Sequence, residues 1–140
     1  MPAYEFTTER DRLDLAVVHA FLTASYWAEG VDVDTVQRSI AGSMCFGFLE
    51  DGATVAFARV VTDAATFAYL ADVFVLPDHR GAGLGKRMVE RILADPRLAT
   101  VRRWVLRTGD AHGLYDRYGF EVTSTPEMWM ERVAGSVTAT

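Results

Sequence analysis

Closely spaced glycines followed by a lysine give residues 80–86 the clearest potential for ligand binding. The segment lies between a hydrophobic run and a helix-like pattern, and its sequence is Arg80-Gly81-Ala82-Gly83-Leu84-Gly85-Lys86. Glycines at alternate positions let consecutive backbone N–H groups point into one concavity, and the positive end of the following helix dipole strengthens their field. The segment therefore predicts a binding site for an anion.

Two common phosphate-binding loops do not fit this spacing. A P-loop ends in Gly-Lys-Ser/Thr, with another glycine five positions before its last one, but Gly85-Lys86 is followed by Arg87 and position 80 is arginine. The dinucleotide pattern Gly-x-Gly-x-x-Gly, counted from Gly81, has Lys86 where its last glycine should stand. Both nucleotide interpretations are excluded by the spacing.

A second pattern, Ala-x-x-Leu-Tyr-x-x-x-Gly-Phe, runs from Ala111 to Phe120 and includes Tyr115. It follows the next strand-like run after the glycine segment. Together, this pattern and Arg80-x-x-Gly83-x-Gly85 resemble two motifs of the GNAT (GCN5-related N-acetyltransferase) superfamily, whose acetyl-CoA signature is Gln/Arg-x-x-Gly-x-Gly/Ala. Two motifs in the right order are far more specific than one, and the resemblance covers residues 70–120.

The resemblance implies acetyl-CoA as co-substrate, without a metal. Backbone amides of the loop would bind the pyrophosphate, and a β-bulge near Phe74 and Val75 would pair with pantetheine and polarise the thioester carbonyl. Thr108 stands where many members of the family have asparagine, and it can still form a hydrogen bond. The expected cofactor-binding residues are Phe74, Val75, Arg80, Gly81, Ala82, Gly83, Leu84, Gly85, Lys86 and Thr108.

Acyl transfer to an amine requires loss of the amine proton, a stabilised oxyanion and a neutralised thiolate. Tyr115 matches the family tyrosine that protonates the thiolate, and a backbone N–H near Val75 would bind the oxyanion. Asp72 lies in an almost wholly apolar run, where an unpaired carboxylate is costly. It is interpreted as the general base, or else as half of a buried ion pair with Arg59 or Arg107.

The acceptor pocket is expected in the segment that joins the first two helices, which often lines it in this superfamily. Here that segment contains Tyr26 and Trp27, followed by Glu29. An ammonium group could lie against either ring with Glu29 as its counter-ion, which predicts a small amine as the acceptor. The alternative is that the two rings only seal the core.

Charge is distributed unevenly along the chain. The net charge is −5, from 14 Lys and Arg against 19 Asp and Glu, yet residues 80–107 contain eight basic and two acidic side chains. A basic segment beside an acidic remainder favours an anionic ligand such as CoA, although a solvated charged helix has the same composition. No basic run contains the interleaved aromatic residues of a nucleic-acid surface, so no nucleic-acid partner is expected.

The alternating and helical hydrophobic patterns predict one α+β domain over residues 1–140. Helices are expected over residues 13–23, 32–40, 83–94 and 111–118, and residues 134–140 should form a flexible tail. Strands are expected over residues 44–49, 54–61, 67–76, 104–106, 120–122 and 128–133. The resemblance implies a central, mostly antiparallel twisted sheet flanked by about four helices.

Location and assembly follow from a few further features. The chain has no apolar run near the roughly 20 residues that span a bilayer, and its first residues do not resemble a secretory signal. A single cysteine, Cys45, is typical of a reducing compartment, so we expect a cytoplasmic protein without a membrane partner. The expected strand over residues 128–133 could pair across a homodimer. Besides an acetyltransferase, the sequence is compatible with a non-catalytic CoA- or acyl-CoA-binding module of the same fold.

Overall fold

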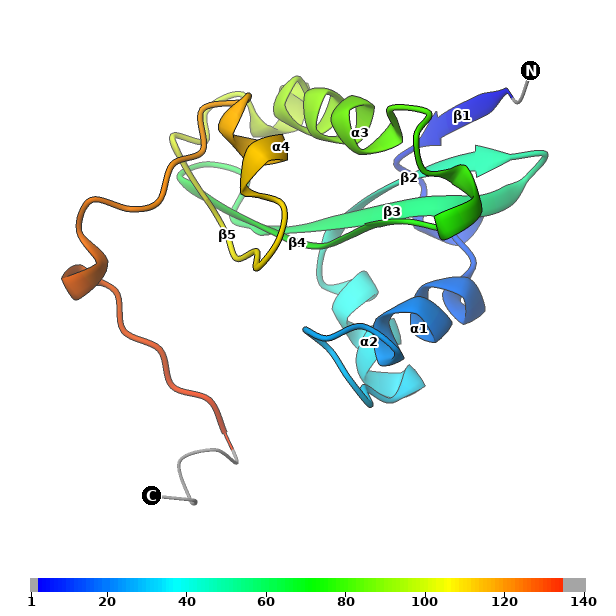
Figure 1. Ribbon diagram of the computed structural model, residues 1–140, viewed down its shortest axis with the longest axis horizontal. Coiled ribbons are helices and arrows are strands. Elements are labelled where there is room, and N and C mark those ends of the chain that lie inside the picture. The colour runs from blue at the N-terminus through cyan, green and yellow to red at the C-terminus, as the bar shows by residue number, and fades with distance from the viewer. Residues whose placement is uncertain (1–2, 135–140) are drawn as a thin grey trace.

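A central sheet separates the helices into two layers (Figure 1). The computed structural model describes residues 3–134. The strands are β1 (Tyr4–Thr7), β2 (Met44–Glu50), β3 (Ala53–Thr62), β4 (Phe67–Val75) and β5 (Arg103–Leu106), and they lie side by side in this order. The helices of the described chain are α1 (Leu15–Thr23), α2 (Val33–Ala41), α3 (Leu84–Leu93) and α4 (His112–Asp116). Only β4 and β5 are parallel neighbours, so the expected α+β class with a mostly antiparallel sheet is confirmed.

The two long strands β2 and β3 are buried on both faces because a helical layer covers each. On one face, Phe46 and Phe48 pack in a cluster with Met88 of α3. On the other face, Phe57 packs in a second cluster with Val18 of α1 and with α2. The sheet is therefore the middle of three layers, which explains why these strands are hydrophobic along almost their whole length.

The first strand was not expected from the sequence. β1 pairs with β2 from Tyr4↔Glu50 to Thr7↔Gly47. The sequence signal for this strand is an alternation of apolar and polar residues. In the structure Phe6 packs against Phe48 with a ring-centroid distance of 5.3 Å, while Glu5 is exposed. Four residues are too short a run to distinguish a strand from a loop by alternation alone.

The expected strands over residues 120–122 and 128–133 are wrong. Within the described chain this region contains only a short 3-10 turn, Pro126–Met128, and it follows Gly119, whose φ is +88°. A strand needs a neighbour to take up its N–H and C=O groups, and β5 pairs with β4 alone. Of the expected tail, all but Ala134 lies outside the described residues.

A β-bulge in β4 opens the sheet. Phe57 of β3 faces Phe74, whereas Arg59 faces Ala71, so Asp72 and the following residue together oppose a single residue of β3. The expected position near Phe74 and Val75 is therefore wrong by about two residues. β4 and β5 pair only as far as Leu70, and beyond it no strand of residues 3–134 lies on that side of the second half of β4.

Gly47 lets the chain before α1 pack tightly on β2. A Cβ atom at this position would clash with Cδ2 of Leu13 and would lie 2.8 Å from the carbonyl oxygen of Ala56. The second neighbour is backbone in the centre of the sheet and cannot easily move. Only glycine fits between β3 and the side chain of Leu13.

We therefore expect Gly47→Ala to destabilise the fold by about 1–3 kcal/mol, because overpacking a core has this cost. Urea denaturation would show the loss as a lower midpoint. Gly113→Ala is the matched control, since a Cβ there meets nothing within 4 Å. Equal midpoints for the two variants would contradict the tight packing at Gly47.

Candidate functional site

The glycine loop presents a row of backbone N–H groups with no protein acceptor. It follows the 3-10 turn Pro77–His79, and φ is +88° at Gly81 and +77° at Gly83, where α3 begins. Among the described residues, the N–H groups of residues 81–86 donate to no carbonyl or side chain, whereas that of Arg87 already bonds to the carbonyl of Gly83. Unpaired amides at a helix N-terminus, as expected from the sequence, can bind an anion.

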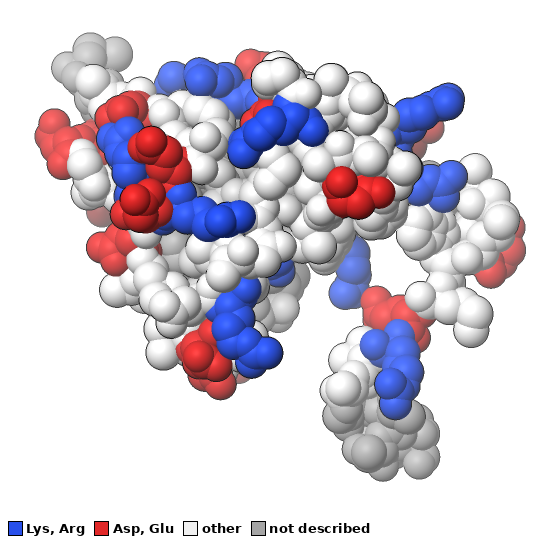
Figure 2. All heavy atoms as spheres, turned by 180° about the vertical axis from the view of Figure 1, so that it is seen from behind, with Lys and Arg blue, Asp and Glu red and all other residues white. Residues whose placement is uncertain are grey.

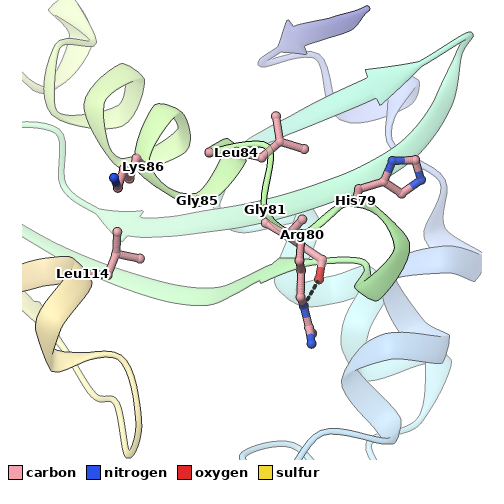
Figure 3. Close-up of a pocket in the computed structure, with 9 residues that line it drawn as sticks. His79, Arg80, Gly81, Leu84, Gly85, Lys86 and Leu114 are labelled. Atoms are coloured by element: carbon pink, nitrogen blue, oxygen red, sulfur yellow. Dashed lines mark hydrogen bonds between the residues drawn. The ribbon is translucent and has the colours of Figure 1, made fainter. Parts of the chain in front are cut away.

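A cavity of about 380 Å³ lies beside these amides (Figure 3). Most of the expected cofactor-binding residues line it, together with two that sequence reasoning missed, His79 and Leu114. Leu114 lies inside the second motif and His79 directly precedes the first, so these positions were the available signal. Ala82 does not line this cavity, and Phe74 is buried against Phe21, with the two rings stacked at 4.1 Å. The lining residues are Val75, His79, Arg80, Gly81, Gly83, Leu84, Gly85, Lys86 and Leu114.

Two side chains brace the loop. Nε of Arg80 donates to the carbonyl oxygen of Val75 at 3.0 Å, which ties the loop back to the end of β4 (Figure 3). The hydroxyl of Tyr4 and Nδ1 of His79 are hydrogen-bonded at 3.1 Å, which ties the loop to β1. Arg80 therefore supports the shape of the loop, and the donors beside the cavity are the backbone N–H groups of the loop together with Lys86.

The N–H of Val75 points toward the opening in the sheet. The next residue, Leu76, donates its N–H to the carbonyl of Val55 on β3 at 2.8 Å. Successive N–H groups of an antiparallel strand point to opposite sides. The N–H of Val75 is therefore directed away from β3, toward the side where the pairing of β4 with β5 has ended. This N–H is a donor at the opening between β4 and β5. It is the group that was expected, from the family resemblance, to bind the oxyanion.

Tyr115 is buried on α4 and lines a second, larger cavity of about 1930 Å³. Its ring packs edge-on against Phe120 at 5.9 Å, and its hydroxyl makes no hydrogen bond within the described chain. Burial, followed by the negative charge of Asp110, raises the pKa of Tyr115 to about 12. The phenol is therefore neutral at ordinary pH and available as a hydrogen-bond donor.

Thr108 shapes the turn that leads into α4. Its hydroxyl oxygen accepts the N–H of Ala111 at 3.0 Å and that of Asp110 at 3.4 Å. The following residue, Gly109, donates its N–H to the hydroxyl of Tyr26 at 3.2 Å. Thr108 thus lines the larger cavity, not the cavity beside the loop, and it holds the turn before Tyr115.

Asp72 occupies the bulge and is ion-paired. Its Oδ2 lies 2.5 Å from Nε of Arg59, and its Oδ1 accepts the indole N–H of Trp27 at 2.9 Å. Arg59 in turn donates to the hydroxyl of Ser43 at 3.1 Å. Of the two partners considered from the sequence, Arg59 forms the pair, whereas Arg107 lies 3.6 Å from Glu131. The network links the α1–α2 connection to the bulge.

The expected acceptor residues are only partly brought together. Tyr26 and Trp27 are exposed at the larger cavity, so they do not seal the core. Their rings contact each other edge-on at 5.1 Å. Glu29 is exposed and does not line the cavity, whereas Asp110 does. The aromatic part of the predicted pocket is present without Glu29.

Two other features of the described residues bear on function. None of the helices is long and apolar enough to cross a bilayer. No group of three or more His, Cys, Asp and Glu side chains could hold a metal ion within the part of the chain that the structure describes. Cys45 is buried in the core, and burial raises its pKa.

Comparison with known proteins agrees with this geometry. Residues 41–122 match the model of the acetyltransferase (GNAT) domain. A crystal structure of a GNAT-family acetyltransferase from Xanthomonas campestris pv. campestris is 46% identical, with a TM-score of 0.92 over 100% of this chain and 99% of that one. A protein of Gibberella zeae named as an acetyltransferase is 28% identical over 138 residues, which span 81% of this chain and 76% of that protein.

The fold is also shared by a more distant acetyltransferase from Clostridium acetobutylicum, in a crystal structure with acetyl-CoA. It is 16% identical, with a TM-score of 0.68 over 95% of this chain and 96% of that one. The matched region of the family model contains the bulged strand, the loop of unpaired amides and the buried tyrosine. The chain belongs to the GNAT family of acetyltransferases.

Proposed function

We propose that this protein transfers the acetyl group of acetyl-CoA to a small amine by direct attack of the amine on the thioester. The observation that carries the proposal is the row of unpaired N–H groups over residues 81–86, next to the opening between β4 and β5. CoA is a polyanion, and these amides lie at the N-terminus of the ten-residue helix α3. The acetyl-CoA in the related fold from Clostridium acetobutylicum supports the same choice of co-substrate.

The reaction uses groups on both walls of the cleft. The amine nitrogen attacks the thioester carbon, the carbonyl oxygen becomes an oxyanion that the N–H of Val75 stabilises, and the C–S bond then breaks. The amine nitrogen loses one proton as the amide forms, and the CoA sulfur gains one. The products are an N-acetyl amine and free CoA thiol. Tyr115 donates its hydrogen bond to the sulfur as negative charge develops there.

The raised pKa of Tyr115 defines this role. A CoA-like thiol has a pKa of about 8.5, so complete transfer of a proton from a phenol of pKa about 12 costs about 5 kcal/mol. Tyr115 therefore stabilises the departing sulfur as a neutral donor, and the proton that finally neutralises the sulfur comes from the amine. This differs from full protonation of the thiolate by the tyrosine.

Asp72 acts in this proposal as a positioning residue. Both of its oxygens are already paired, one with Arg59 and one with Trp27, and this favours an anchoring role over that of a general base. The pair holds the bulge and fixes the indole at the wall of the larger cavity. The acceptor would bind as an ammonium against the rings of Tyr26 and Trp27, by cation–π attraction, and would attack as the neutral amine after it loses one proton to solvent.

Acetyl-CoA should raise the thermal unfolding midpoint by several degrees, because a ligand at a hundred times its Kd adds about 2.7 kcal/mol. Gly85→Glu should abolish this rise. The new side chain has room, since a Cβ there meets only Cδ2 of Leu114 at 3.7 Å, but its charge repels the pyrophosphate. Gln37→Glu, an exposed change on α2, is the control and should keep the rise. A wild type without any rise, or an undiminished rise in Gly85→Glu, would reject the loop as the CoA site.

Tyr115→Phe should lower kcat by about 100-fold, the lower range for a group that stabilises a leaving atom, while the acetyl-CoA midpoint shift is kept. Because the pKa of Tyr115 is about 12, the ratio of wild-type to variant rates should stay constant between about pH 6 and pH 10. Thiol release against a panel of amines measures both. Tyr118→Phe is the control, since that hydroxyl is exposed and bonded to Glu90. A rate ratio that falls between pH 8 and pH 9 would show instead that the phenol ionises with the thiol.

Asp72→Asn and Arg59→Gln test the positioning role. Each breaks the same pair, so both should lower kcat/KM to a similar degree and lower the unfolding midpoint, with no change in the shape of the pH–rate profile. If Asp72 is instead the general base, only Asp72→Asn removes the acidic limb of the profile. Trp27→Phe, which replaces the indole and its N–H with a smaller ring, should weaken acceptor binding and leave the acetyl-CoA midpoint shift intact.

A further inference from the structure

Asp110 gives the larger cavity a carboxylate that has no cationic partner. Within residues 3–134 no Lys, Arg or His side chain forms an ion pair with it, and its Oδ1 accepts a hydrogen bond only from the hydroxyl of Tyr26, at 3.5 Å. Asp72, which lines the same cavity, is by contrast neutralised by Arg59. The charge of Asp110 is therefore available to a cation that enters the cavity from solution.

Tyr26 and Trp27 place two exposed aromatic rings beside this carboxylate. The rings meet at an interplanar angle of 80°, and the two residues are 64% and 42% exposed. Gly109, the residue before Asp110, donates its N–H to the hydroxyl of Tyr26 at 3.2 Å, so the turn that carries the carboxylate is tied to the aromatic pair. An ammonium group that is attracted to a ring face can therefore also reach a carboxylate.

The same carboxylate lies near the phenol of Tyr115. Burial raises the pKa of Tyr115 most, and the charge of Asp110 and the hydroxyl of Tyr26 raise it further. Electrostatic effects fall with distance, so both groups lie close to the phenol. Asp116 and Glu121 also line the cavity, but neither contacts Tyr26 and neither affects this pKa. Asp110 is thus the carboxylate of the cavity that lies near both the aromatic pair and the phenol.

The larger cavity is open to solvent. Figure 2 shows a wide hollow between the body and the segment that follows α4, and residues 120–125 of that segment form part of the cavity wall. The cavity has a volume of about 1930 Å³, whereas sites for small ligands usually have about 300–1,000 Å³. A charged amine can therefore reach Asp110 from solution while acetyl-CoA lies on the glycine loop.

Four arginines of the described chain line the same cavity and would repel an ammonium group. They are Arg59, Arg102, Arg103 and Arg107. Arg59 and Arg107 are already paired with carboxylates. Arg103 lies over the ring of Trp129 at 5.8 Å. Arg102 has no such partner among the described residues, but it lies at the opposite end of β5 from Asp110. The unpaired positive charge is therefore separated from the unpaired carboxylate by the length of a strand.

We propose that Asp110 is the counter-ion that holds the acceptor as an ammonium against the rings of Tyr26 and Trp27, so that the cavity selects alkylamines over neutral molecules of the same shape. Alkylamines are cationic at neutral pH, as the lysine side chain is. Acetylation removes this charge, so the product no longer pairs with Asp110 and is released more easily than the substrate. The assignment rests on the proposed function, because it specifies the acceptor of that reaction.

NMR titration with three small probes tests the preference for a cation. Cyclohexylamine is cationic at neutral pH, whereas cyclohexanol and N-cyclohexylacetamide carry the same ring without a charge. The indole N–H signal of Trp27 reports binding, and among the three tryptophans of the chain it is the signal that Trp27→Phe lacks. In the wild type the cation should bind about fivefold more tightly than either neutral probe, which is the upper range for an exposed ion pair.

Asp110→Asn separates the charge from the shape of the side chain. The amide keeps an oxygen that can accept the hydroxyl of Tyr26, so the preference for the cation should fall below about twofold while the neutral probes bind as before. The control Asp34→Asn makes the same change on α2, where the exposed carboxylate lies 3.8 Å from Arg38, and it should keep the full preference.

Three results would overturn the proposal. They are a wild type that prefers neither kind of probe, a preference that Asp110→Asn leaves unchanged, and a preference that is lost in Glu29→Gln but not in Asp110→Asn. Acetyl-CoA midpoint shifts and thiol release on the same proteins report separately on the proposed function. An active acetyltransferase without a preference for cations, or a protein that binds the cation without transferring acetyl groups, would show which of the two ideas has failed.

Discussion

The ion pair between Arg59 and Asp72 is the contact on which the geometry of the cleft depends. Asp72 has a φ of +55°, a left-handed conformation that costs a residue with a Cβ about 1–2 kcal/mol. The guanidinium on one carboxylate oxygen and the indole of Trp27 on the other hold the residue in this conformation. The bulge turns β4 out of register beside the place where its pairing with β5 ends. One contact therefore stabilises the strained backbone, helps to open the sheet and orients an aromatic wall of the larger cavity.

Positive potential at the loop comes from the backbone more than from the arginines around it. Arg80, the charged residue of the motif, bonds to the carbonyl of Val75. Arg87 and Arg91 lie over the rings of Phe48 and Phe6 at 4.8 and 4.2 Å, on the face of the sheet. An anion bound in this cavity would meet a row of fixed N–H dipoles, which lose no side-chain freedom when a ligand binds, together with Lys86. The basic composition of residues 80–107 pointed to this part of the chain, yet only Arg80 and Lys86 of its basic residues line the cavity.

The parts of the site that could be predicted are those encoded within a few neighbouring residues. Alternate glycines before a helix produce the loop, and the spacing from Ala111 to Phe120 places Tyr115 on α4. Contacts between distant residues could not be read in this way. The bond from Trp27 to Asp72 joins positions 45 apart, and that from Tyr4 to His79 joins positions 75 apart. The expected strands over residues 120–122 and 128–133 failed for a related reason, because a pattern of apolar residues can fit a strand but does not show whether the segment reaches the free edge at β5.

Separation of charge along the cleft explains how a neutral phenol can serve a reaction of a polyanion. The amides that would hold the pyrophosphate lie at the N-terminus of α3, whereas Tyr115 is buried on α4 beside the apolar ring of Phe120. If phosphate charge lay close to Tyr115, the pKa of the phenol would rise further and its hydrogen bond to a developing thiolate would weaken. Burial and the nearby charge of Asp110 both raise the pKa of Tyr115, so the phenol stays protonated. In the proposed reaction the loop would meet the permanent charge of the co-substrate, and Tyr115 would meet the charge that appears as the C–S bond breaks.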